Sequence, residues 1–177
     1  MMKKIASLLS AAAFLVILCG GSALFAQDNE TVTFEVNLAA YYNLSIGQTT
    51  ITFTDVAPSP VENPPAVSIP ANQNPVSVTA FAIMLPGTGL KLTVTANGNL
   101  SKGSGSDIDI SAINWTVTGA GYQDGTLQNL TEVKAGQWGA SVFHYHAGSF
   151  SYFFARDYKT QEPGDYTATA TYTLSAV

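Results

Sequence analysis

The chain ends with Gly164-Asp-Tyr-Thr-Ala-Thr-Ala-Thr-Tyr172-Thr-Leu-Ser-Ala-Val177, the most regular alternation of side-chain types in the sequence. Tyr, Ala and Leu side chains fall on one side of an extended chain, and Thr and Ser side chains fall on the other. This period of two predicts a half-buried β-strand, begun by a turn at Pro163–Asp165. We expect the strand to close a sheet, with Tyr166, Tyr172 and Leu174 facing the core.

Similar stretches recur upstream of this strand, separated by segments rich in Gly, Pro, Asn and Ser. They predict strands at residues 31–38, 41–46, 49–55, 76–85, 90–96, 108–117, 126–130, 141–145 and 149–155. The stretch 76–85 is almost continuously apolar, so we expect its strand to be covered on both faces.

Short turns between neighbouring strands predict three β-hairpins. The turn residues are Gly47-Gln48, Pro86–Gly89 and Ala147-Gly148. Residues 57–75 contain six prolines, which predict a surface connection with room for an edge strand at 66–69. Residues 97–107 read as an exposed loop, and Trp138 reads as part of a Gly-rich turn.

About eight to ten short strands, with no helical pattern beyond the N-terminal segment, predict the fold class. We expect an all-β protein, a single antiparallel two-sheet β-sandwich of the Ig-like or pilin-like kind. The abundance of Thr, Ser, Gly and Asn in a chain with few charged residues is typical of an extracellular β-protein.

The N-terminal segment has the pattern of a secretory signal peptide. Lys3-Lys4 precedes an apolar run over residues 5–18, and small residues follow around Ala26. We predict a signal peptide at 1–26 and the sandwich domain at 27–177. The run is shorter than the ~20 residues that span a bilayer, so no membrane span is expected after cleavage. Cys19 follows Leu18 rather than a small residue, which argues against lipidation.

Cleavage would leave a domain without cysteine, whose stability depends on its apolar core alone. Five basic residues would remain against all 12 acidic ones, a difference of −7. Nucleic acid is a poor partner for such a charge. The expected location is extracellular or at the cell surface, or the periplasm if the source is a Gram-negative bacterium.

The ending resembles the closing motif of the WxL domains of bacterial surface proteins, roughly Gly-x-Tyr-x-Ala-x-(apolar)-x-Trp-x-Leu. Gly164, Tyr166, Ala168 and Leu174 match that motif, and Tyr172 stands where it has Trp. A weaker likeness is to fimbrial and spore-coat-type sandwich subunits, which also end in an alternating strand after Gly. Both resemblances imply a secreted bacterial β-sandwich with a role in attachment or assembly.

Two clusters of side chains are candidate metal sites. His144 and His146 lie two residues apart on one face of a strand, a spacing that binds Zn²⁺ or Cu²⁺ when a third ligand arrives. No third ligand is evident, and two exposed histidines near a turn are more often plain surface residues. Asp107 and Asp109 offer two carboxylates for Ca²⁺, which takes about six to eight oxygens. We therefore predict no metal and no cofactor.

Aromatic residues concentrate between positions 138 and 154. Alternation assigns Phe150, Tyr152 and Phe154 to the core, which leaves an exposed platform for stacking on sugar rings. The glycan-binding candidates are therefore Trp138, Tyr145 and Phe153. The sequence has no G-x-S-x-G elbow and no cysteine nucleophile, and both histidines sit in one short stretch. We predict that the protein is not an enzyme.

The sequence thus favours a non-enzymatic structural or attachment domain that is secreted or displayed at the cell surface. Cell-wall or extracellular polysaccharide and other surface proteins are the expected partners. One alternative is a carbohydrate-binding module that uses exposed aromatic residues. The other is a fimbria-like subunit that assembles by strand exchange through Thr31–Leu38, whose apolar residues alternate just after the cleavage site.

Overall fold

The computed structural model describes residues 32–58, 60–61 and 63–177. The predicted signal peptide, residues 1–26, lies outside the described residues. The chain divides into two units, Met1–Val36 and Asn37–Val177, and the strands described below lie in the second unit.

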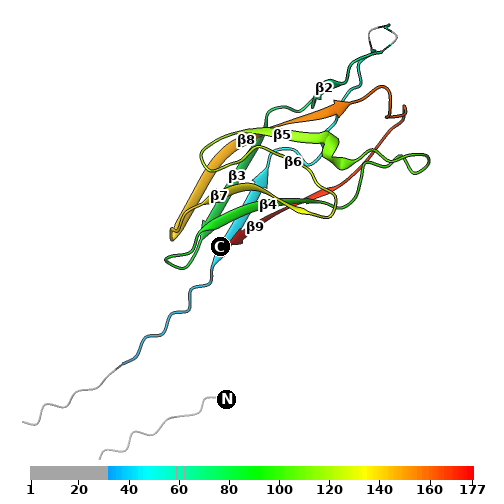
Figure 1. Cartoon of the computed structure of the whole chain (residues 1–177). Coiled ribbons are helices and arrows are strands. Elements are labelled where there is room, and N and C mark those ends of the chain that lie inside the picture. Colours follow the sequence, from blue (N-terminus) through cyan, green and yellow to red (C-terminus); the bar gives the residue numbers. More distant parts are fainter. Residues whose placement is uncertain (1–31, 59, 62) are drawn as a thin grey trace, which may run out of the picture. The chain divides into compact units, whose positions relative to one another are not determined.

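One sheet gathers six strands around the long β8 (Figure 1). Its order is β1-β3-β8-β5-β6, and β2 pairs with β8 next to β3. All of these pairs are antiparallel. The strands are β1 (Tyr41–Ile46), β2 (Val67–Pro70), β3 (Val76–Ile83), β5 (Ile113–Thr118), β6 (Gly125–Thr126) and β8 (Phe143–Arg156).

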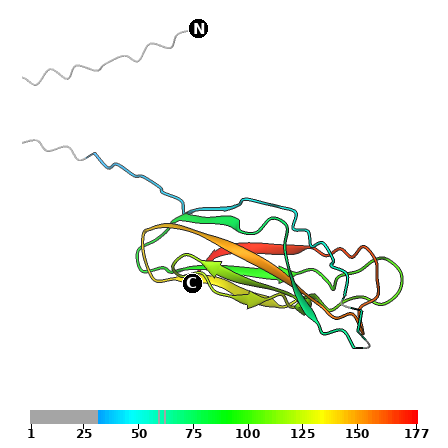
Figure 2. The same ribbon diagram turned by 90° about the horizontal axis from the view of Figure 1, so that it is seen from above.

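A second antiparallel sheet has the order β7-β4-β9 and faces the first, as Figure 2 shows. Its strands are β4 (Leu90–Ala96), β7 (Glu132–Trp138) and β9 (Ala170–Ala176). A short 3-10 helix, η1 (Ile110–Ala112), leads into β5. Inward side chains of both sheets, among them Val78, Leu92 and Phe150, form one core. The predicted all-β, two-sheet antiparallel sandwich is therefore confirmed.

The hairpin predicted around Ala147-Gly148 is wrong, because residues 143–156 form the single strand β8. Gly148 serves close packing here rather than a turn. A Cβ at this position would meet the backbone oxygen of Thr118 and would lie 2.8 Å from the ring of Tyr122. Glycine lets these two groups lie against the middle of β8.

The hairpin predicted around Pro86–Gly89 is also wrong, since β3 and β4 belong to different sheets. The turn carries the chain from one layer of the sandwich to the other. The double coverage expected for residues 76–85 fails as well. Val76, Val78, Ala80 and Ala82 are buried, but the residues between them are half-buried or exposed, so β3 has one open face.

Two further predicted strands are absent from the described residues. Residues 32–38 form no strand, and Val32, Phe34, Val36 and Leu38 are 70–88% exposed. Residues 49–55 also lack a strand partner, so the hairpin predicted around Gly47-Gln48 does not form, and β1 pairs with β3 instead. Both segments therefore have the alternating side chains of a strand, but their backbones are not paired in a sheet.

Other predictions hold in part. The proline-rich connection does contain an edge strand, β2. Of the strand predicted at 108–117, only the second half forms β5, because residues 110–112 form η1. The closing strand is β9, shorter than expected at its start, and Tyr172 and Leu174 do face the core, although each is only half-buried. The sequence interpretation missed β7 and extended β6 too far.

Candidate functional site

A groove of about 1210 Å³ opens between residues 44–55 and residues 162–172. These two walls belong to the edge strands β1 and β9 and to the chain that adjoins each of them. Apolar side chains from both sheets and their connections line the space between the walls: Ile69, Leu100, Ile108, Ile110, Ile113, Leu127 and Phe154. The groove is therefore an opening in the side of the hydrophobic core.

The first wall has the side-chain pattern of a strand. Leu44, Ile46, Ile51 and Phe53 are half-buried and pack against the core, while their neighbours in the sequence are exposed. Phe53 lies 5.9 Å from Phe154 between ring centroids. The wall thus presents a row of apolar side chains to the groove.

The second wall is anchored by Tyr172. Its ring stacks on Phe150 at 5.8 Å, and its hydroxyl lies 2.7 Å from the hydroxyl of Tyr152 across the two sheets. Burial raises the pKa of Tyr152 to about 12 and also raises the pKa of Tyr172. Both phenols therefore stay protonated at neutral pH, and the hydroxyl pair can hold the start of β9 against β8.

The backbone of β9 is paired on one side only, within the part of the chain that the structure describes. Gly89 and Val177 exchange both backbone hydrogen bonds, at 3.0 and 2.9 Å. In an antiparallel pair, residues that exchange two bonds alternate with residues that exchange none. The register of β4 and β9 therefore directs the N–H and C=O groups of Tyr172 and Leu174 away from β4, towards the open edge.

The same alternation holds along the first wall. The N–H of Gly47 donates to the Ser77 oxygen at 2.8 Å, which fixes the register of β1 on β3 and directs the backbone groups of Leu44 and Ile46 outward. Further along, Thr52 uses its own backbone groups to bond Asn72 N–H at 2.9 Å and the Gln73 side chain at 2.9 Å. Side chains that border the groove thus come from residues whose backbone groups point to a free edge.

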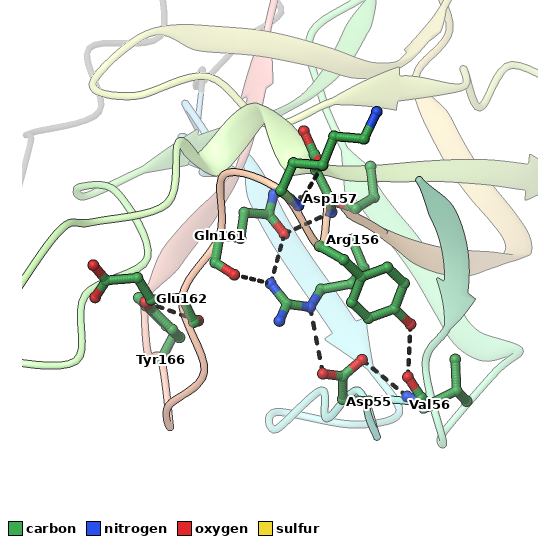
Figure 3. A network of polar contacts seen from close by, with 10 residues as sticks. Asp55, Val56, Arg156, Asp157, Gln161, Glu162 and Tyr166 are labelled. Atoms are coloured by element: carbon green, nitrogen blue, oxygen red, sulfur yellow. Dashed lines mark hydrogen bonds and ion pairs between the residues drawn. The ribbon is translucent and has the colours of Figure 1, made fainter. Parts of the chain in front are cut away.

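One end of the groove is tied together by the buried Arg156 (Figure 3). Its Nε donates to Asp55 at 3.3 Å, and its Nη1 donates to the Gln161 backbone oxygen at 2.6 Å. The Tyr158 hydroxyl donates to the Val56 oxygen at 2.6 Å. Residues 55–56 on one wall are thereby joined to residues 156–161, which precede the other wall. This network fixes the spacing of the two walls at that end.

The histidines are not exposed, which corrects the sequence interpretation: His144 is buried and His146 is half-buried. His144 is 2% exposed, and its Nδ1 lies 3.1 Å from Nε2 of His146. Nε2 of His144 has no hydrogen-bond partner among the described residues. Burial and the neighbouring His144 lower the pKa of His146. No group of three or more His, Cys, Asp or Glu side chains that could hold a metal occurs in the residues described.

Trp138 is not part of an exposed platform, contrary to the prediction. It ends β7, is 8% exposed and stacks on the His146 ring at 4.4 Å with an interplanar angle of 9°. Its indole N–H donates to the Ala120 oxygen at 2.8 Å. Trp138 therefore packs in the core and is no longer a candidate for glycan binding.

Asp107 and Asp109 are exposed and lie on a shallow surface near Asp157. Asp109 accepts the Ser111 N–H at 2.8 Å and so caps η1. Its pKa is lowered by the Ser111 side chain and then by this backbone N–H. Asp157 accepts from the Lys159 N–H and from the Thr160 hydroxyl, and its pKa is lowered in the same way. These carboxylates stabilise local turns.

Tyr145 is 61% exposed, as predicted. Phe153 was also expected to be exposed, but it is half-buried and lies elsewhere on the sheet. The structure instead gathers Tyr145 with Tyr41, Phe81 and Phe143 at one end of the outer face of β1, β3 and β8. Phe81 lies 5.7 Å from Tyr41 and 5.6 Å from Phe143 between ring centroids, both edge-to-face. The sequence did not reveal this cluster, because its members come from three strands whose order was unknown.

The groove was likewise missed by the sequence interpretation, which placed strands at 31–38 and 49–55, where the described residues form none. No helix long and apolar enough to cross a membrane occurs in the described ranges. No protein-family model matches this chain, and no curated protein or solved structure matches it significantly.

Proposed function

We propose that this chain is a non-enzymatic structural subunit of a bacterial extracellular or cell-surface assembly, in which an extended segment of a neighbouring subunit fills the groove between β1 and β9. One observation carries the proposal. The sandwich has an apolar opening in its side, bordered on both walls by backbone donors and acceptors that no strand uses within the described residues.

An extended segment suits this groove better than a small molecule. Free backbone groups on Tyr172 and Leu174 match the N–H and C=O spacing of an added strand, a common mode of peptide recognition. Leu44 and Ile46, and then Ile51 and Phe53, are two pairs of half-buried side chains on the first wall, and within each pair the spacing of two residues matches side chains on one face of an added strand. An unpaired edge of this kind also promotes association between chains.

The location rests on the sequence. The Lys3-Lys4 and apolar pattern of the N-terminus favours export, and the closing motif that ends in Leu174 resembles that of WxL surface domains. Tyr172, which stands where that motif has Trp, is the residue that anchors the second wall of the groove.

The test is self-association of residues 27–177 in analytical ultracentrifugation over a wide concentration range. Wild type should assemble as concentration rises. Ala170→Pro removes an N–H from the open edge of β9 at a small, exposed side chain, and proline is tolerated at such an edge. This variant should melt like wild type and assemble poorly. A strictly monomeric wild type, or undiminished assembly of Ala170→Pro, would overturn the proposal.

Carbohydrate binding is a second candidate, favoured by the exposed cluster of Tyr41, Phe81, Phe143 and Tyr145. The outer faces of β1, β3 and β8 around this cluster carry Ser, Thr, Asn and Ala and no charged residue, which suits a neutral polysaccharide. Insoluble peptidoglycan, chitin and cellulose should be tested in pull-down assays. Binding that is lost in Tyr145→Ala but retained in Phe153→Ala would support this function, and absence of binding to all three would remove it.

A further inference from the structure

We infer that the segment filling the groove is Val32–Leu38 of a second copy of this chain. This inference rests on the proposed function and names the partner and the segment that it supplies. The second copy inserts one face of this segment into the groove of the first copy, and the other face stays in solvent. The inserted side chains are Val32, Phe34, Val36 and Leu38, and the solvent-facing ones are Thr33, Glu35 and Asn37.

Residues 32–38 have the side-chain pattern of a strand, but they form no strand in the structure. Val32, Phe34, Val36 and Leu38 are 70%, 88%, 77% and 84% exposed. Apolar side chains at alternating positions bury one face only when the chain is extended against a partner. Four large exposed apolar residues in seven therefore mark a surface that needs a partner.

The segment fits within the length of the first wall and has the same number of apolar positions. Seven extended residues span about 23 Å, and the ten wall residues 44–53 would span about 33 Å at the same rise. Leu44, Ile46, Ile51 and Phe53 present four half-buried apolar side chains on the first wall. The donor offers four apolar side chains in return.

Charge also agrees. Glu35 is the one charged residue of the segment, and its parity places it on the solvent side. The charged residues that line the groove are Asp55, Arg156, Glu162 and Asp165. Asp55 and Arg156 pair with each other at 3.3 Å, and Glu162 pairs with Lys102 at 2.7 Å. A strand with an uncharged inner face leaves both ion pairs intact.

A second copy is favoured over the chain's own segment by the connection to β1. Only Ala39 and Ala40 separate Leu38 from Tyr41, where β1 begins. β1 borders the groove, so insertion into the chain's own groove would require a complete reversal within these two residues. Two-residue reversals favour residues that adopt positive φ, such as Gly, Asn or Asp, and disfavour alanine. A segment supplied by a second copy needs no such reversal.

Matched charge substitutions on the two faces of the segment test the inference. Phe34→Asp with Val36→Asp places two carboxylates on the inserted face, whereas Thr33→Asp with Asn37→Asp places two on the solvent face. Burying an unpaired carboxylate is costly, so the first double variant should weaken self-association on the order of a hundredfold or more. The second should assemble within a few-fold of wild type. Both should retain the wild-type melting temperature as monomers, because all four side chains are exposed.

The pattern of outcomes separates this inference from the proposed function. If Ala170→Pro fails to assemble but Phe34→Asp with Val36→Asp assembles like wild type, another segment fills the groove, and only the inference is overturned. If wild type does not assemble, or if both of these variants assemble like wild type, the inference and the proposed function are overturned together.

Cysteine cross-linking locates the contact directly, because Cys19 is the only cysteine of the chain and lies in the predicted signal peptide. Val36→Cys in one population and Ala168→Cys, on the second wall, in another should form a disulfide-linked heterodimer when mixed. Ala147→Cys, exposed on the outer side of β8, is the matched control and should not cross-link with Val36→Cys. Equal cross-linking at positions 168 and 147 would contradict the inference.

Discussion

The two sides of the sandwich differ: one is closed by backbone pairing, and the other is left open. On the side of β6 and β7, residues 119–124 connect β5 to β6 of the first sheet and also pair with β7 of the second: Gln137 N–H donates to the Gly121 oxygen at 2.8 Å and Gln123 N–H donates to the Ala135 oxygen at 2.9 Å. On the side of β1 and β9, only side chains make the connection: the Tyr152–Tyr172 pair joins the two sheets and Arg156 joins the ends of the two walls, and the groove remains between these walls.

This difference teaches that an apolar core can be complete at one side and unfinished at the other. The closed side uses glycines to bring backbone and large rings together, as at Gly121 and Gly125, where a Cβ would collide with Trp138 and Trp115. The open side has alternating apolar residues and free backbone groups instead. We regard the closed side as the source of folding stability and the open side as the site of assembly.

The largest expected effect comes from breaking the closed side at Trp115. This residue is 1% exposed, and its indole N–H donates to the Gln123 oxygen at 2.9 Å. Trp115→Ala should lower the free energy of unfolding by about 3–5 kcal/mol, measured by chemical denaturation. Tyr145→Ala, at an exposed position, should change it by no more than about 0.5 kcal/mol. Similar losses in both variants would show that the closed side is not where stability resides.

The next effect concerns the glycines of the same side. Gly121 has φ +84°, and a Cβ there would meet the Trp138 indole. Gly121→Ala should therefore cost about 2–4 kcal/mol from backbone strain and overpacking. Gly139→Ala, where nothing lies within 4 Å of the added Cβ, should leave the free energy of unfolding nearly unchanged; chemical denaturation of both variants measures the difference. A well-tolerated Gly121→Ala would mean that residues 119–124 pack less tightly against β7 than described.

On the open side, truncation should cost less. Leu174 is half-buried at the edge of β9, so Leu174→Ala should lower the stability of the monomer by about 1–2 kcal/mol rather than by the larger loss of a fully buried leucine. The same substitution should be more damaging in the assembly, where a donated strand would cover it. Comparing urea midpoints of monomeric and assembled samples checks this. An equal loss in both would argue against coverage of the edge.

The smallest effect expected is a pH dependence from His146. Its pKa in the folded chain lies below the ordinary 6.5, because burial and His144 disfavour the charged form. The unfolded chain therefore binds the proton more readily, so this contribution to stability is complete above pH 6.5 and is lost as the pH falls towards the folded pKa. Melting temperatures between pH 7.5 and pH 5 should fall less in His146→Gln than in wild type. Parallel pH curves for the two proteins would contradict this.

Much of the fold could be predicted from alternation alone, because a half-buried strand repeats every two residues whatever its partner. This holds for β1, β5 and β9. The pairing of strands could not be predicted, since Pro86–Gly89 and Ala147-Gly148 look like hairpin turns. One connects two layers and the other lies inside β8. Glycine in a sequence does not reveal whether it serves positive φ or close packing.

The candidate sites show the same limit. Tyr145 was correctly expected to be exposed, whereas Trp138 and His144 proved to be buried. Burial of these two residues depends on their contacts across the sandwich, which periodicity does not encode. The alternation of Val32–Leu38 was visible in the sequence, but only the structure shows that these apolar residues are exposed and that a groove of suitable size exists.

Amide hydrogen exchange along β9 tests most directly whether the open side accepts a strand. Thr171 and Thr173 direct their N–H groups towards β4, and Tyr172 and Leu174 direct theirs to the open edge, so each residue has its own neighbour as control. In the monomeric Phe34→Asp/Val36→Asp variant, Tyr172 and Leu174 should exchange rapidly while Thr171 and Thr173 stay protected. In assembled wild type all four should be protected. Rapid exchange at Tyr172 and Leu174 in the assembly, or full protection in the monomer, would contradict the account.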